Sequence, residues 1–263
     1  MQKIIIHIDP NSIYYSVVIK YGLKVAQNFG AQLNFYYVKE NHSKYVEEEE
    51  QEKTLEKLNE AVYSHLGKQH VGLKVKTAVV FGDRRLELNR LTRKLKPDLL
   101  IMGTHKNNAL LKLLYKDEAV SIAHEVSCPV LLIPPNKTST STNRIIYTSE
   151  LIGTELYSLQ QIKDWASTFN TEVICLHPSE ESKPTEQEKR MENQLQEFFG
   201  KTHFHFVGFD ADELEKIHEL VDFNEGDLLI AIYHRRKWWA EMLKPSSSVE
   251  LAKHATIPML IIK

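Results

Sequence analysis

The tetrapeptide Asp-Leu-Leu-Ile occurs at residues 98–101 and again at residues 227–230, and this repeat constrains the fold more than any other feature of the sequence. The two copies lie 129 residues apart, and at the same spacing Pro129 is matched by Pro258. A unit of this length is long enough to be a domain in its own right. We therefore expect the 263 residues to form two tandem copies of one domain.

Within each copy, short apolar runs alternate with segments that have helical periodicity. This alternation is typical of parallel strands joined by right-handed helical connections, and the continuously apolar strands indicate a sheet covered on both faces. We expect an α/β fold in which each domain has a five-stranded, mainly parallel sheet flanked by helices. The predicted strands of the first copy are residues 4–8, 33–38, 75–81, 98–103 and 129–133. Those of the second copy are residues 145–147, 173–176, 203–206, 227–230 and 258–262.

The segment from residue 134 to residue 143 has no apolar residue other than two prolines, which is typical of an exposed linker. We predict a first domain at residues 1–135, a linker at residues 136–143 and a second domain at residues 144–263.

Composition excludes several classes of function. The formal net charge of −2 gives no basic excess, so we expect no nucleic-acid partner. No apolar run approaches the roughly 20 residues that span a bilayer, so we expect no membrane partner. The first apolar run is too short for a signal peptide, and the two cysteines, Cys128 and Cys175, do not form a disulfide framework. We expect a cytoplasmic protein with both cysteines buried in the core.

The ligand site of an open parallel sheet lies beyond the C-terminal ends of the strands, where the strand order reverses. In the first copy this rule points to the loops that follow Ile8, Val38 and Met102.

In the first copy Asp9 closes the first strand, Leu100–His105 spans the end of the fourth strand, and Ser127–Ile133 leads into the fifth. These three segments resemble a universal stress protein domain. The resemblance extends over nearly the whole chain, twice. This arrangement of two domains is similar to that of the tandem members of the family. It implies two adenine-nucleotide-α-hydrolase-like (Rossmann-like) domains that form an internal pseudo-dimer, with their last strands paired antiparallel.

The resemblance also implies a nucleotide site, because ATP-binding members carry Gly-x2-Gly-x9-Gly-Ser/Thr after the fourth strand. Glycines let the backbone approach phosphates closely. At these four positions the first copy has Gly103, Lys106, Lys116 and Asp117, so one glycine remains. The candidate site, with ATP or another adenine nucleotide as its ligand, consists of Asp9, Val38, Gly103, Thr104, His105, Lys106 and Lys116.

The second copy departs further from the motif. Its four positions hold Ile232, Arg235, Pro245 and Ser246, and Glu150 replaces the aspartate after the first strand. A β-branched residue and a proline oppose close backbone approach and remove a donor.

Other groupings of residues have simpler interpretations. Asp9 and His105 could form an acid–base pair. We instead interpret Asp9 as part of a vestigial ligand site and His105 as a polar loop residue. His203 and His205 lie at i and i+2 on a predicted strand, but no third metal ligand is near. We expect neither a catalytic site nor a metal site.

Three functions remain open. The first is a non-enzymatic stress-response protein that acts as a ligand-responsive or scaffold module with a degenerate nucleotide site. The second is an active adenine-nucleotide binder that uses Lys106 and Lys116 of the first domain. The third is a structural module that binds a protein partner, or forms a homo-oligomer, through Trp238 and Trp239.

Overall fold

The computed structural model describes residues 1–41, 46–104, 118–135, 140–148, 156–179, 185–200, 204–210, 225–232 and 257–262. These residues fall into two compact units, and the described residues up to Thr140 belong to the first unit and those from Ser141 to the second. The predicted boundaries of the linker, and the predicted pairing of the two domains, stay predictions.

The first unit is an α/β domain whose five strands lie in the order β3-β2-β1-β4-β5, all parallel. This order confirms the predicted fold class. Its elements are β1 (Lys3–His7), α1 (Tyr15–Phe29), β2 (Gln32–Lys39), α2 (Glu48–Tyr63), η1 (Lys68–His70), β3 (Val75–Phe81), α3 (Arg84–Leu95), β4 (Leu99–Gly103), α5 (Glu118–Glu125) and β5 (Val130–Ile133).

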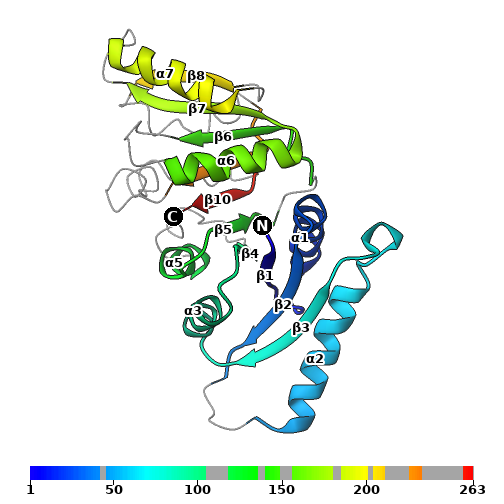
Figure 1. Cartoon of the computed structure of the whole chain (residues 1–263). Helices are drawn as coiled ribbons and strands as arrows, with labels where there is room; N and C mark the ends of the chain where they lie inside the picture. Colours follow the sequence, from blue (N-terminus) through cyan, green and yellow to red (C-terminus); the bar gives the residue numbers. More distant parts are fainter. Residues whose placement is uncertain are drawn as a thin grey trace. The chain divides into compact units, whose positions relative to one another are not determined.

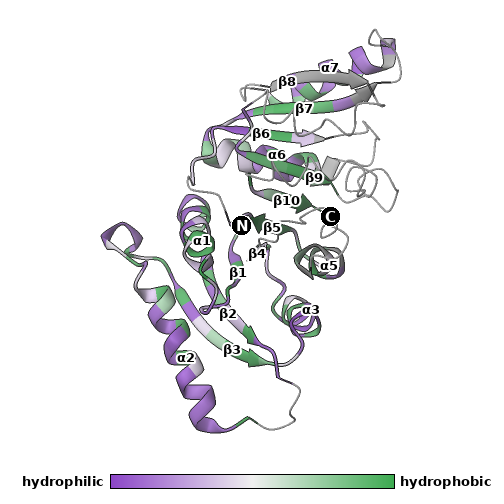
Figure 2. Ribbon diagram, turned by 180° about the vertical axis from the view of Figure 1, so that it is seen from behind, coloured by the Kyte–Doolittle hydropathy of each residue, from purple (hydrophilic) through white to green (hydrophobic). Residues whose placement is uncertain are grey.

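Helices cover both faces of this sheet. Figure 1 shows α1 and α2 on one face and α3 and α5 on the other, and each pair is in contact. The central strands are therefore enclosed, and Ile4–Ile6 and Leu99–Ile101 have no exposed surface. Figure 2 shows the consequence in the colouring, because the inner strands are hydrophobic whereas α2 is hydrophilic along most of its length.

The second unit repeats the strand order of the first. Its strands lie in the order β8-β7-β6-β9-β10, again all parallel. Its described elements are β6 (Arg144–Thr148), α6 (Leu156–Phe169), β7 (Glu172–Ser179), α7 (Glu186–Phe199), β8 (Phe204–Asp210), β9 (Leu228–Ile232) and β10 (Met259–Ile262). The spacing of Leu214, Ile217 and Val221 predicts a further helix between β8 and β9, and these residues lie outside the described part of the chain.

The aspartate of the repeated tetrapeptide bonds the start of the neighbouring strand in both units. In the first unit, the Asp98 carboxylate accepts hydrogen bonds from the backbone N–H groups of Gln2 (2.6 Å) and Lys3 (2.8 Å). In the second, the Asp227 carboxylate accepts from the backbone N–H of Asn143 at 2.8 Å. The N–H of each aspartate also donates to the carbonyl of the first residue of the adjacent strand, Lys3 or Arg144, at 2.9 Å. Each aspartate thus fixes the register between the first and fourth strands of its unit.

One predicted packing face differs from the structure. The periodicity of the second helix predicts Leu55, Leu58, Val62 and Leu66 on one face, but Leu55 is 36% exposed and Leu66 lies beyond the end of α2 at Tyr63. Thr54 is buried instead, together with Leu58, Ala61 and Val62. The Thr54 hydroxyl donates to the Glu50 carbonyl at 2.6 Å, which satisfies its hydrogen-bonding need inside the helix.

Two other sequence predictions can be compared with the structure. Cys128 and Cys175 are both buried and neither forms a disulfide, which confirms that they pack in the cores of their units. Among the helices that the structure describes, none is long and apolar enough to cross a membrane.

The two hydrogen bonds that the Asp98 carboxylate accepts predict a measurable contribution to the free energy of unfolding. We predict that Asp98→Ala lowers the free energy of unfolding by about 1–2 kcal/mol, because two backbone donors lose a charged acceptor. Asp227→Ala should also lower it, since the Asp227 carboxylate accepts from the backbone N–H of Asn143. Urea unfolding measured by circular dichroism tests this, with Glu52→Ala on the exposed side of α2 as the control. Equal midpoints for wild type and Asp98→Ala would contradict the assignment.

Candidate functional site

The candidate site begins where β1 and β4 end together. The pairing of these strands runs from Ile4 opposite Leu99 to His7 opposite Met102. Asp9 and Gly103, which follow within two residues, therefore reach the same C-terminal edge of the sheet, as the sequence predicted.

Asp9 is engaged in a tight turn. Its Oδ1 accepts from the backbone N–H of Asn11 at 2.8 Å and from the side-chain amide of Asn11 at 2.9 Å. The Asp9 carbonyl also accepts from the N–H of Ser12 at 3.0 Å. One oxygen of the Asp9 carboxylate is thus held by the protein itself.

Asn11, which was not among the residues predicted from the sequence, connects three elements. Its amide donates to the Tyr37 hydroxyl of β2 at 3.0 Å, and its carbonyl oxygen accepts from the Lys57 ammonium of α2. The Lys57 cation and the Asp9 carboxylate therefore lie on opposite ends of one amide. An Asp-x-Asn sequence just after a strand was a usable signal for an Asx turn, but nothing in the sequence pointed to Tyr37 or Lys57 as its partners.

Tyr37 is held in its neutral form. Its side chain is 7% exposed, and burial raises the pKa of the phenol above its usual value near 10, with the nearby Asp9 carboxylate adding to the effect. At neutral pH this residue is a hydrogen-bonding group without charge.

Gly103 has a packing role. A Cβ at this position would lie 3.0 Å from Cγ2 of Val18, which is in α1. The absence of a side chain therefore lets α1 approach the end of β4. This geometry explains the glycine without a phosphate.

Thr104 continues the edge of the sheet for one more residue. Its backbone N–H donates to the Ile133 carbonyl at 2.9 Å, and its hydroxyl lies 3.5 Å from the same oxygen. The N–H of Thr104 is therefore bonded within the sheet and is not available to a ligand.

Of the other predicted site residues, Val38 is buried, with 1% of its side chain exposed. A ligand could meet only its backbone. His105, Lys106 and Lys116 lie outside the described residues, as do Arg235–Trp239 and Glu150 of the second unit.

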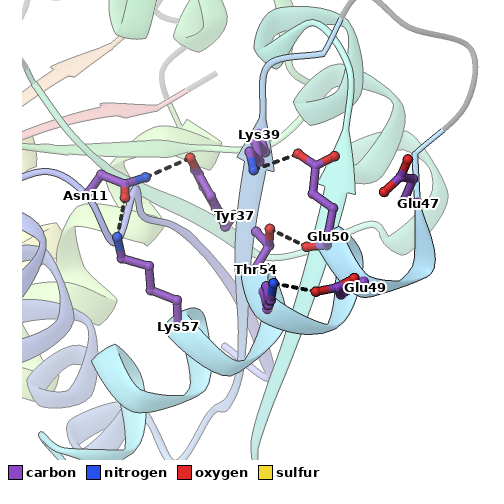
Figure 3. Close-up of a pocket in the computed structure, with 9 residues that line it drawn as sticks. Asn11, Tyr37, Lys39, Glu47, Glu49, Glu50, Thr54 and Lys57 are labelled. Carbon is purple, nitrogen blue, oxygen red and sulfur yellow. Dashed lines mark hydrogen bonds and ion pairs between the residues drawn. The ribbon is translucent and has the colours of Figure 1, made fainter.

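A pocket of about 470 Å³ opens beside Asn11, which is within the range of small-molecule sites. β1 pairs with β2 only as far as Tyr36, so the last residues of β2 extend beyond it and face the first turns of α2. Figure 3 shows the side chains from β2, α2 and the loop after β1 around this space. The lining residues are Asn11, Tyr37, Lys39, Glu47, Glu49, Glu50, Lys53, Thr54 and Lys57.

The charges around the pocket are paired. Lys39 lies 2.8 Å from Glu50 and Lys53 lies 2.5 Å from Glu49, both measured between ammonium nitrogen and carboxylate oxygen. With three lysines and three glutamates in the lining, the pocket carries little net charge. None of the four predicted residues that the structure describes lines it.

The corresponding place in the second unit holds a histidine–glutamate pair. His177 takes the position of Tyr37, because Glu172 pairs with the first residue of β6 as Gln32 pairs with that of β1. Its Nε2 lies 3.2 Å from Oε1 of Glu188, and both side chains are nearly buried. Glu188 also accepts from the backbone N–H of Thr185 and so caps α7. The two units thus differ at the end of their second strand.

His205, one of the two histidines considered as metal ligands, lies on β8 with its Nε2 2.7 Å from the Glu172 carboxylate. His203 is outside the described residues. In the part of the chain that the structure describes, no group of three or more His, Cys, Asp or Glu side chains could hold a metal ion.

Comparison with protein families gives one match. The model of the universal stress protein family matches residues 1–134, which is half of the chain and corresponds to the first unit. No curated protein shows significant sequence similarity to the chain.

Solved structures resemble the chain over its whole length. A universal stress protein from Archaeoglobus fulgidus DSM 4304 is 15% identical, with a TM-score of 0.72 over 99% of this chain and 96% of that one. A protein of Pseudomonas aeruginosa UCBPP-PA14, described as a universal stress protein, is 16% identical, with a TM-score of 0.70 over 100% and 93%. The cytoplasmic domain of a prokaryotic cation chloride cotransporter is 12% identical, with a TM-score of 0.53 over 99% and 94%. At these identities the likeness shows the fold alone.

The close approach at Gly103 can be tested by a double-mutant cycle. We predict that Gly103→Ala lowers the free energy of unfolding by about 1–3 kcal/mol, because the new methyl group crowds Val18. In a Val18→Ala background the same change should cost clearly less, since the crowding atom is gone. Additive effects of the two substitutions in chemical unfolding would show that Gly103 is required for another reason.

The buried phenol predicts a loss of stability at high pH. Since the folded-state pKa of Tyr37 lies above the unfolded value, its stabilising contribution is complete below about pH 10 and is lost as the pH rises further. Between pH 9 and pH 11 the wild-type protein should therefore lose more stability than Tyr37→Phe. Tyr63→Phe, at an exposed position of α2, is the matched control and should follow the wild type. Parallel curves for wild type and Tyr37→Phe in urea titrations would contradict this.

Proposed function

The chain belongs to the universal stress protein family, and we propose that it is a non-enzymatic stress-response protein, a ligand-responsive or scaffold module with a degenerate nucleotide site. The observation that carries this proposal is the bond between the Thr104 N–H and the Ile133 carbonyl at 2.9 Å. A phosphate bound after β4 needs free backbone donors, and the first of them is used by the sheet.

The electrostatics of the neighbouring pocket support the same proposal. Glu47, Glu49 and Glu50 line the side of the pocket formed by the start of α2. A triphosphate placed there would lie close to three carboxylates, whose repulsion offsets the attraction of the lysines. The pocket is better matched to a ligand of low net charge.

A ligand in this pocket would contact three elements at once. Asn11 belongs to the loop after β1, Tyr37 belongs to β2, and Lys57 belongs to α2. These residues already form one hydrogen-bonded chain, so a bound molecule that replaced one of its members would act on the others. This linkage supports a ligand-responsive role.

A second candidate is adenine-nucleotide binding by the first unit. The observation that favours it is the position of Asp9 and Gly103 at one edge of the sheet, where the strand order reverses between β1 and β4. Lys106 and Lys116 would then supply charge in place of the missing glycines.

A thermal-shift panel separates the two candidates. A nucleotide present at 100 times its Kd would stabilise the fold by about 2.7 kcal/mol and raise the Tm by several degrees. We predict no change in Tm with ATP, ADP or AMP at millimolar concentration with Mg²⁺, measured against Mg²⁺ alone. A saturable rise that disappears in Asp9→Ala would support nucleotide binding and overturn the first proposal.

A further inference from the structure

A serine of α1 and a histidine just beyond α2 form a hydrogen-bonded pair away from the pocket. Ser16 lies in the first turn of α1, and His65 follows the C-terminal end of α2. The Ser16 hydroxyl oxygen lies 2.8 Å from Nε2 of His65. A hydroxyl in hydrogen-bond contact with an imidazole nitrogen is the arrangement in which a serine can be activated as a nucleophile.

The second ring nitrogen fixes the tautomer of His65. Nδ1 lies 2.8 Å from the carbonyl oxygen of Ala61. A carbonyl oxygen can only accept, so Nδ1 carries the hydrogen and donates it. In the neutral ring Nε2 is therefore the unprotonated nitrogen, and the Ser16 hydroxyl must donate to it. The base faces the serine with its lone pair.

The imidazole is also fixed in orientation. The ring of Tyr15 packs edge-on against it, with centroids 5.9 Å apart and an angle of 75° between the planes. Tyr15 and the Ala61 carbonyl together act as positioning groups, in the way that a third group orients the base in serine hydrolases. Here that third group is a neutral carbonyl, so the stabilisation of a developing imidazolium is weaker than a carboxylate would give.

Ser16 has two further properties that suit a nucleophile. Its side chain and that of His65 are both partly exposed, so a small molecule can reach them. Ser16 is the second residue of α1, where the positive end of the helix dipole favours negative charge on the hydroxyl oxygen.

We propose that Ser16 is an acyl-acceptor site, activated by His65 and modified by small activated acyl esters or thioesters. The Ser16 oxygen attacks the acyl carbonyl carbon while its proton passes to Nε2 of His65. The bond between the acyl carbon and the leaving group then breaks, and the leaving alcohol or thiol takes the proton from His65. The product is an O-acyl ester on Ser16, with no change of oxidation state.

This site extends beyond the proposed function, because it is a covalent modification site and requires neither the pocket nor a nucleotide. Acylation places an ester on the oxygen that bonds His65, so it breaks the Ser16–His65 contact between α1 and α2. The modification would thereby act on α2, the helix that Lys57 also joins to Asn11 in the loop before α1.

The experiment uses the full chain and p-nitrophenyl acetate as the acyl donor, with intact mass and peptide mapping as the readout. We expect one acetyl group on Ser16, added faster than on any other hydroxyl. His65→Gln should slow its addition by roughly 10²-fold or more, because a general base contributes about 10²–10⁴-fold. Ser16→Ala should abolish it.

Two controls keep the result interpretable. Ser64→Ala removes the neighbouring hydroxyl, which lies 3.2 Å from Nδ1 of His65, and should leave the labelling of Ser16 within about a factor of a few of the wild type. The Tm of each variant shows that it is folded. An acetyl group on a lysine or a cysteine is distinguished from one on Ser16 by its position in the peptide map. If Ser16 is acetylated no faster than Ser64, or if His65→Gln folds and labels Ser16 at the wild-type rate, the proposal is wrong.

Discussion

The contact on which this structure depends is the hydrogen bonding of one carboxylate to the start of the neighbouring strand. Asp98 holds the N–H groups of Gln2 and Lys3, and its own N–H bonds the Lys3 carbonyl. Residues of two paired strands advance together, so fixing which residues are opposite at the first position fixes the register of every later pair. The strands β1 and β4 consequently end at the same edge of the sheet. The positions of Asp9 and Gly103, which follow these strands, depend on this register.

Much of the fold could be predicted because its signals are local or repeated. The Asp-Leu-Leu-Ile repeat and the apolar runs predicted the parallel sheets, and the clamp by Asp98 and Asp227 explains why the aspartate recurs. The predicted face of α2 was less accurate, because Leu55 is exposed and Thr54 is buried. Periodicity counts only apolar residues, so it does not predict that a threonine lies on the buried face. Thr54 can lie there because its hydroxyl is hydrogen-bonded within the helix.

The candidate site was only partly visible in the sequence. Asp9 and Gly103 were predicted from their places after strands, and they do meet at one edge of the first sheet. Asn11, Lys57 and His65 were not predicted, because their partners lie many residues away in the chain. The sequence does not indicate which distant residue a polar side chain in a loop or on a helix surface will bond. Such contacts are identified only from the three-dimensional structure.

Polar side-chain bonds join α2 and the residues just beyond it to α1 and to the loop before α1, and this has a dynamic consequence. Lys57 bonds Asn11, His65 bonds Ser16, and the side chain of Gln27 bonds the Gln69 carbonyl just beyond α2. Water can replace each of these bonds, and α2 itself buries few apolar side chains. The apolar side chains that α2 does bury are Leu58, Ala61 and Val62, so we expect this helix to open at a lower free-energy cost than the enclosed strand β4. Amide hydrogens of α2 then exchange with solvent through that opening, well before those of β4.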